Sequence, residues 1–113
     1  MLMLTPEQLD ALRRITSPTL SNAIERFNVR PRNRGFMDSS IRCLFPELGA
    51  MVGYAVTAAC QAEMPAPQGR GPSRFAHWDH IASMPAPRVM VIQDLDQPPG
   101  VGAYWGEVQA SVH

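Results

Sequence analysis

The sequence predicts an α/β fold, and two observations carry this prediction. Segments with helical periodicity alternate with apolar, β-branched runs in the order helix pair, strands, helix, strand, helix, which is typical of α/β proteins. The chain has 113 residues, of which 45% are hydrophobic, so it has the size of one domain with a single core. No internal repeat is present in the sequence.

Two short amphipathic helices are expected at the N-terminus, within residues 1–28. The run Thr5-Pro6-Glu7-Gln8 is a helix start, with threonine as N-cap, proline at the first helical position and glutamine completing a capping box. Ser17-Pro18 repeats the start signal for a second helix. Each helix has one apolar stripe, formed by Leu9, Leu12 and Ile15 in the first and by Leu20, Ala23, Ile24 and Phe27 in the second.

Three apolar segments are expected to form strands. Residues 41–45 alternate along the chain until a proline ends the run. Residues 51–62 are small and β-branched, which favours a strand buried on both faces, and Gly53 within them indicates a close backbone approach or a bulge. Residues 89–92 form the buried run of the clearest strand, with two aspartates at its exit.

Two further helices are expected in the second half of the chain. Residues 63–73 are rich in proline and glycine and should form a loop. Ser73 can then cap a short helix that carries Phe75, Trp78 and Ile81 on one side. The final helix is expected to begin at Gly106, after a glycine-containing loop.

Charge and cysteine content exclude several classes of function. Ten arginines balance ten acidic residues, so nucleic acid is not an expected partner. Residues 1–8 lack the basic region of a signal peptide, and no apolar run approaches the ~20 residues that a membrane span needs. We therefore expect a soluble, cytoplasmic protein without a membrane partner. Cys43 and Cys60 lack CxxC spacing, which favours buried free thiols over a disulfide or a zinc site.

Two patterns admit a functional interpretation, although a structural one is favoured for each. His77 and His80 are three residues apart and share a helix face, a spacing that suits a metal, but a third ligand at matching spacing is absent. The tryptophan between them indicates a packing helix. Arg30, Arg32 and Arg34 alternate in a loop, where we favour solvated side chains over an anion or subunit contact.

The strongest candidate site from the residues alone is the loop-to-helix junction at residues 102–109. Ligands of α/β sheets bind outside the carboxyl ends of the strands, and a helix N-terminus suits a carboxylate or phosphate. Gly106 would let such a ligand approach the backbone closely. The sequence contains no nucleophile-and-base pair, P-loop or dinucleotide fingerprint.

Four stretches resemble the RraA-like family, in family order and spacing: SPTLSNAIERF, MVGYAVTA, PAPRVMVIQDLDQPP and YWGEVQASVH. They cover most of the chain from Ser17 to His113 and leave the 63–73 loop unmatched. The family includes regulators of ribonuclease activity, 4-hydroxy-4-methyl-2-oxoglutarate aldolases and proteins labelled demethylmenaquinone methyltransferases. The resemblance implies a three-layer β/β/α fold and a homo-oligomer, either a trimer or a hexamer. In that single domain, residues 1–28 would be the N-terminal helices and residues 40–113 the start of the core.

The resemblance also implies a function. The full-length protein would be a divalent-metal-dependent lyase, an aldolase or decarboxylase that forms pyruvate from 4-hydroxy-2-oxo acids or oxaloacetate. Gly106, Glu107, Val108 and Gln109 match the stretch that binds the pyruvate part of the substrate through its backbone. Farther along, family aldolases carry an Arg-Asp pair, whose Asp holds a metal, usually magnesium, through water. The metal polarises the 2-keto group and stabilises the enolate, while the helix N-terminus neutralises the carboxylate.

The sequence departs from this pattern because it ends at His113, before such a pair. Asp94 and Asp96 cannot substitute, since they precede Gly106 and no arginine follows them. We therefore expect the catalytic residues to lie beyond this sequence, and the chain alone to bind no metal and to be inactive. A truncated gene, a truncated or cleaved product and a partial sequence record would each explain this, and we rank all three above a complete small protein. A lesser departure is Asn22, where many relatives have aspartate.

Two alternatives to the enzyme stay open. The chain could be an inactive remnant that folds only through oligomeric contacts, or a non-catalytic regulator that binds a ribonuclease, as some relatives do. An Arg-Asp pair downstream in the gene would favour the enzyme, and a downstream sequence without it would favour the regulator. We rank the enzyme first, the remnant second and the regulator third.

Overall fold

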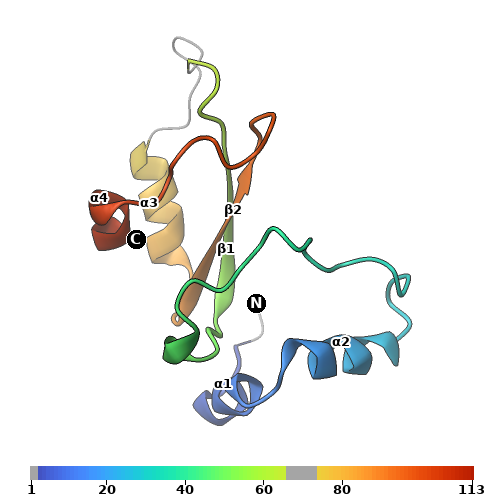
Figure 1. Cartoon of the computed structure of the whole chain (residues 1–113). Helices are drawn as coiled ribbons and strands as arrows, with labels where there is room; N and C mark the ends of the chain where they lie inside the picture. Colours follow the sequence, from blue (N-terminus) through green and yellow to red (C-terminus); the bar gives the residue numbers. More distant parts are fainter. Residues whose placement is uncertain (1–2, 66–73) are drawn as a thin grey trace. The chain divides into compact units, whose positions relative to one another are not determined.

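The computed structural model describes residues 3–65 and 74–113. The chain divides into two compact units, Met1–Val52 and Gly53–His113, which are described separately below as unit 1 and unit 2. Helices and a small parallel sheet are both present, so the protein is of the mixed α/β class (Figure 1). The expected cap at Ser73, and most of the 63–73 loop, lie outside the described residues.

Unit 1 begins with the two expected helices, α1 (Pro6–Arg13) and α2 (Ser17–Glu25). The capping box of α1 is confirmed, because the Thr5 side chain accepts from the Gln8 amide at 3.3 Å and the Thr5 amide donates to Gln8 Oε1 at 2.8 Å. The cap of α2 is Thr16, one residue earlier than expected, and its Oγ1 accepts from the Thr19 amide at 3.4 Å. Local hydrogen bonds thus define both helix starts.

The strand expected at residues 41–45 is not formed. Between α2 and Val52, the chain contains one 3-10 turn, Pro46–Leu48 (η1), and no strand. A strand exists only when its backbone pairs with a neighbour, and an alternating sequence without such a partner remains irregular. Cys43 is consequently exposed and not buried as expected, and Leu44 is 80% exposed. Both cysteines are free thiols, as the sequence predicted.

Unit 2 is built on two parallel strands, β1 (Tyr54–Cys60) and β2 (Arg88–Asp94), which pair along their full length from Tyr54 opposite Arg88 to Cys60 opposite Asp94. The connection between them contains α3 (Arg74–Ser83), because parallel strands require a crossover (Figure 1). Peptide bonds preceding two prolines, Ala86–Pro87 before β2 and Gln97–Pro98 after it, are cis.

The close backbone approach expected at Gly53 is confirmed. A Cβ atom at this position would lie 2.6 Å from the carbonyl oxygen of Pro87, so only glycine fits without a shift. Immediately afterwards, the amide of Tyr54 donates to the same oxygen at 2.8 Å. Gly53 therefore brings the start of β1 against the segment that leads into β2.

The sheet of unit 2 is covered on one face only, so the prediction that residues 51–62 are buried on both faces was wrong. Val56 is 1% exposed, whereas its neighbours Ala55 and Thr57 point to the other face and are exposed. Ile81 of α3 is 8% exposed, and α3 lies on the covered face with α4 (Glu107–Val112) beside it (Figure 1). In the β2 run 89–92, Val91 is exposed and the other three residues are half-buried, because among the described residues the sheet has only two strands.

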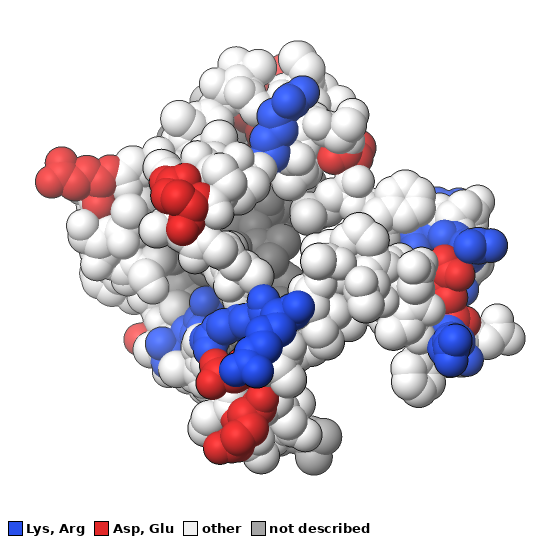
Figure 2. Space-filling view, turned by 60° about the horizontal axis from the view of Figure 1, so that its bottom comes forward, with Lys and Arg blue, Asp and Glu red and all other residues white. Residues whose placement is uncertain are grey.

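The final helix begins where the sequence predicted. Gly106 is its N-cap, and the Ala110 amide donates to the Gly106 carbonyl at 2.9 Å. None of the helices within residues 3–65 and 74–113 has the length and apolar character to cross a membrane. Acidic and basic side chains lie beside one another on the face drawn in Figure 2, in keeping with a net charge of zero.

Candidate functional site

The carboxyl ends of β1 and β2 meet in a loop cluster organised by two aspartates. Asp94, the last residue of β2, accepts from the Asp96 amide through Oδ1 at 2.9 Å and from the Gly100 amide through Oδ2 at 2.6 Å. These backbone donors, first Asp96 and then Gly100, lower the pKa of Asp94 from its ordinary value. Asp94 therefore folds the loop after β2 back onto the strand end.

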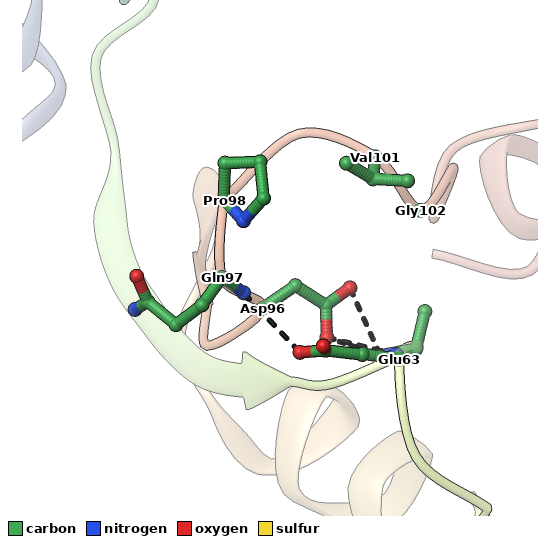
Figure 3. A pocket seen from close by; sticks show the side chains of 7 residues that line it. Glu63, Asp96, Gln97, Pro98, Val101 and Gly102 are labelled. Atoms are coloured by element: carbon green, nitrogen blue, oxygen red, sulfur yellow. Dashed lines mark hydrogen bonds between the residues drawn. The ribbon is translucent and has the colours of Figure 1, made fainter.

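Asp96 joins the two strand ends and is 3% exposed. Its Oδ1 accepts from the amides of Ala62 and Glu63, both at 2.9 Å, and its Oδ2 lies 3.2 Å from the Ala62 amide. In return, the Gln97 amide donates to Glu63 Oε2 at 3.4 Å (Figure 3). A buried carboxylate needs such donors, and here they come from the segment that follows β1.

The hydrogen bonds from the Ala62 and Glu63 amides to Asp96 are called the Asp96 clamp below. A pocket of about 360 Å³ opens beside this clamp. Its walls are formed by residues that follow the two strands: Ala62, Glu63, Asp96, Gln97, Pro98, Val101 and Gly102. The Asp96 carboxylate points toward the Glu63 backbone, while Pro98 and Val101 form an apolar wall (Figure 3). Both oxygens of Asp96 accept backbone hydrogen bonds, so this carboxylate ties the segment after β1 to the end of β2.

The loop held by Asp94 is expected to lose stability in acid. The pKa of the Asp94 carboxyl is lowered in the folded state, so the folded state binds fewer protons than the unfolded state over the titration range. The stabilisation is thus complete above the ordinary aspartate pKa of 3.8 and is lost as the pH falls through the lower folded-state value. Carbon-detected NMR titration should find the Asp94 carboxyl titrating below 3.8.

A matched pair of variants checks this assignment. Asp94→Asn should remove most of the pH dependence of the unfolding midpoint in this range, since the asparagine side chain has no carboxyl group to titrate. Asp79→Asn, on the exposed side of α3, serves as the control and should titrate like the unaltered chain. An Asp94 carboxyl that titrates at or above 3.8 would contradict the assignment.

The thiol of Cys60 is not set up as a nucleophile. Burial raises its pKa, and the nearby carboxylates of Asp94 and Asp96 raise it further. The thiol of Cys60 therefore stays protonated at neutral pH.

Three polar side chains converge between α3 and α4. His77 Nε2 lies 3.1 Å from His113 Nε2, and the Tyr104 hydroxyl lies 3.5 Å from the first and 3.3 Å from the second. Burial lowers the pKa of His77, and the neighbouring His113 and His80 lower it further. This cluster was missed by the sequence analysis, which paired His77 with His80.

The predicted site at residues 106–109 lies at the start of α4 and contributes nothing to the wall of the pocket near Asp96. Gly106 has extended backbone angles, and a Cβ atom there would meet nothing within 4 Å. No side chain caps α4. Glu107 and Val108 are exposed, whereas Gln109 is half-buried and its carbonyl oxygen accepts from the His113 ring at 2.8 Å.

The arginines of unit 1 do not converge on a common point. Arg30 Nη1 donates to the Gly35 carbonyl at 3.1 Å, and Arg32 Nε donates to Glu25 Oε1 at 3.2 Å. Arg34 is exposed. These contacts are local, which favours the solvated-loop interpretation.

The RraA-like resemblance places its magnesium-binding aspartate beyond His113, outside this sequence. Within residues 3–65 and 74–113, no group of three or more His, Cys, Asp and Glu side chains is arranged to hold a metal. Asp94 and Asp96 accept hydrogen bonds from backbone amides of the segments that follow the two strands. Comparisons with models of known families, with curated proteins and with solved structures found no match.

Proposed function

We propose that this chain is RraA-like and that residues 106–109 bind the carboxylate of a 2-oxo acid. In this proposal a longer form of the protein is a divalent-metal-dependent lyase that releases pyruvate from 4-hydroxy-2-oxo acids or oxaloacetate. The catalytic Arg-Asp pair of that form is not within the present sequence, since residues 107–113 contain neither arginine nor aspartate.

One observation carries the proposal. Of the stretches that resemble the family, MVGYAVTA covers most of β1 and PAPRVMVIQDLDQPP contains β2, and the two strands pair in parallel. The loop after β2 leads directly into the fourth stretch, YWGEVQASVH, with Gly106 at the helix start. This arrangement is the one that an α/β ligand site at the carboxyl end of a sheet requires.

The chemistry at residues 106–109 is that of carboxylate binding by backbone amides. The first amides of a helix have no acceptor within the helix, and the dipole places partial positive charge there. Because Gly106 has no side chain and the space around it is open, a small anion can reach the amides of Glu107 and Val108. Each contact would be a charge-assisted hydrogen bond.

Pyruvate binding tests this site. Titrating pyruvate into the isotope-labelled chain should shift the amide signals of residues 106–109 more than any others. Gly106→Ala is compatible with the extended backbone but places a methyl group in the approach path, and should raise the Kd by roughly tenfold, which corresponds to about 1.4 kcal/mol. Val112→Ala, at the other end of α4, is the matched control.

Two outcomes would contradict the proposal. In the first, the amides of residues 106–109 do not respond to millimolar pyruvate. In the second, Gly106→Ala binds like Val112→Ala. The same chain, incubated with magnesium and 4-hydroxy-4-methyl-2-oxoglutarate, should release no pyruvate above the blank. A clear rate would show that catalytic groups lie within residues 1–113.

Protein binding is the alternative function, and one observation favours it. Unit 1 exposes large apolar side chains between α2 and the start of unit 2, with more than half of each side chain accessible: Phe27, Val29, Phe36, Met37, Ile41, Leu44, Phe45, Leu48 and Met51. Exposed apolar surface of this kind marks contact sites between proteins. These side chains could be covered by further copies of the chain, since the family resemblance implies a homo-oligomer, or by a ribonuclease. Neither kind of protein binding requires pyruvate to bind at Gly106.

A further inference from the structure

The cluster between α3 and α4 brings together three donor atoms from distant parts of unit 2. His77 comes from α3, Tyr104 from the loop before α4, and His113 from the end of α4 (Figure 1). Their heteroatoms form a triangle with sides of 3.1, 3.3 and 3.5 Å. All three residues are half-buried.

Hydrogen bonding alone does not account for this triangle. His113 Nδ1 lies 2.8 Å from the Gln109 carbonyl oxygen, which can only accept, so in the neutral ring Nδ1 carries the hydrogen and Nε2 carries a lone pair. The remaining donors are one N–H of His77 and one hydroxyl of Tyr104. A hydrogen bond needs its own hydrogen, so two hydrogens cannot form hydrogen bonds along all three sides of the triangle. The two distances from the Tyr104 hydroxyl are also long for an O–H donor.

The same geometry suits a metal ion. Ligand atoms held 2.0–2.1 Å from a tetrahedral zinc ion lie roughly 3.3 Å from one another, which is close to each side of the triangle. The Gln109 carbonyl orients His113 in the way that a hydrogen-bond acceptor commonly orients a metal-bound imidazole. Imidazole nitrogens favour zinc and its transition-metal neighbours over magnesium or calcium.

The surroundings leave room for a further ligand. A hollow of about 310 Å³ lies against His113, and most of its other walls are apolar, with one arginine among them: Val56, Ile81, Arg88, Met90, Trp105 and Ala110. The Trp105 ring packs edge-on against His113, with ring centroids 5.3 Å apart. Three protein ligands beside an apolar hollow match the pattern of zinc sites that keep one position open.

We propose that His77, Tyr104 and His113 bind one divalent transition-metal ion, with zinc as the expected ion. The two imidazoles ligate through Nε2 as neutral rings. Tyr104 ligates through oxygen and releases its hydroxyl proton to the solvent, so binding is accompanied by proton release. A fourth position is taken by water. This site is separate from the carboxylate site of the proposed function and does not depend on it.

Calorimetric titration of the chelator-treated chain with zinc tests the site. We expect one zinc ion per chain and a proton release that shows as a dependence of the heat on the buffer. His77→Ala and His113→Ala should each weaken binding at least about tenfold, a loss of about 1.4 kcal/mol. His80→Ala removes an exposed histidine from the same helix and should bind zinc like the unaltered chain.

A conservative variant distinguishes the loss of a metal ligand from misfolding of the chain. Tyr104→Phe keeps the ring that packs on Trp105 and His113 and removes only the oxygen, so it should fold normally, bind zinc more weakly and release fewer protons. Cobalt added to the unaltered chain should give the visible absorption of a site with four or five ligands, and zinc should displace it.

Several results would overturn the proposal. One is a chain that takes up no zinc at micromolar concentration. Another is binding that His77→Ala and His113→Ala leave unchanged, or that His80→Ala weakens as much as they do. A third is a folded Tyr104→Phe variant with unaltered affinity and proton release, because the tyrosine oxygen would then not be a ligand.

Discussion

Replacing Val56 by aspartate is expected to unfold unit 2. Val56 is the only described side chain that is fully buried, at 1% exposure, and it lies in the middle of β1. The substitution removes the roughly 1.5–3 kcal/mol that burial of this side chain contributes and places an unpaired carboxylate against an apolar surface. A unit of this length has a total stability of only about 3–9 kcal/mol.

The neighbouring residue supplies the control for this experiment. Thr57 is in the same strand but points to the exposed face, so Thr57→Asp carries the same charge into the same backbone environment. Its cost should stay below about 1 kcal/mol, the range of strand propensity. Amide spectra should lose their dispersion for residues 53–113 in Val56→Asp and keep it in Thr57→Asp. Equal behaviour of the two variants would show that Val56 is not the centre of the core.

Replacing Asp96 by alanine is expected to separate the two strand ends. The change leaves the amides of Ala62 and Glu63 without their acceptor and opens a hole beside Gly102, whose Cβ position would lie 3.3 Å from Asp96 Oδ2. A lost acceptor of this kind costs roughly 1–3 kcal/mol for each donor, and because the backbone of residues 62–63 is exposed, water recovers part of it. We expect a net loss of about 2–3 kcal/mol.

Hydrogen exchange reports this change at the residues concerned. The amides of Ala62 and Glu63 should exchange much faster in Asp96→Ala, while amides in the middle of β1 should change only as far as the global stability does. Asp96→Asn keeps one accepting oxygen, so its Ala62 and Glu63 amides should exchange at rates between those of the unaltered chain and those of Asp96→Ala. Asp79→Ala on α3 is the control and should exchange like the unaltered chain. Protection of both amides that persists in Asp96→Ala would contradict the clamp.

The two aspartates at the end of β2 illustrate why acidic residues at a strand end do not by themselves make a catalytic site. Asp94 and Asp96 stand where α/β enzymes place functional groups, yet each accepts its hydrogen bonds from backbone amides of the loops that it holds. Their role is to shape the carboxyl end of the sheet, which in turn directs the chain toward Gly106 and α4.

Helix α4 connects both proposed sites. It has six residues, too few for a stable isolated helix in water. His113 links its end to His77 of α3, and the Gln109 carbonyl holds the His113 ring. Residues 106–109 therefore depend for their position on contacts that the cluster provides, although pyruvate binding and zinc binding are measured independently.

The sequence by itself determined those features that depend on residues close together in the chain. The capping box at Thr5 and Gln8 was predictable because its two hydrogen bonds span three residues. The final helix after Gly106, the strand with Asp94 and Asp96 at its exit, and the backbone approach at Gly53 followed from similarly local signals. The RraA-like resemblance, built on the same stretches, remains a prediction.

Features that depend on contacts with distant segments of the chain were decided only by the tertiary structure. Residues 41–45 alternate like a strand but have no paired neighbour, and β1 is apolar enough for burial on two faces but is covered on one. His77 has His80 on the same face of its helix, yet its ring meets His113, 36 residues away. Strand pairing, burial and ligand clusters arise from contacts between distant segments, and periodicity within one segment carries no information about which segment arrives opposite.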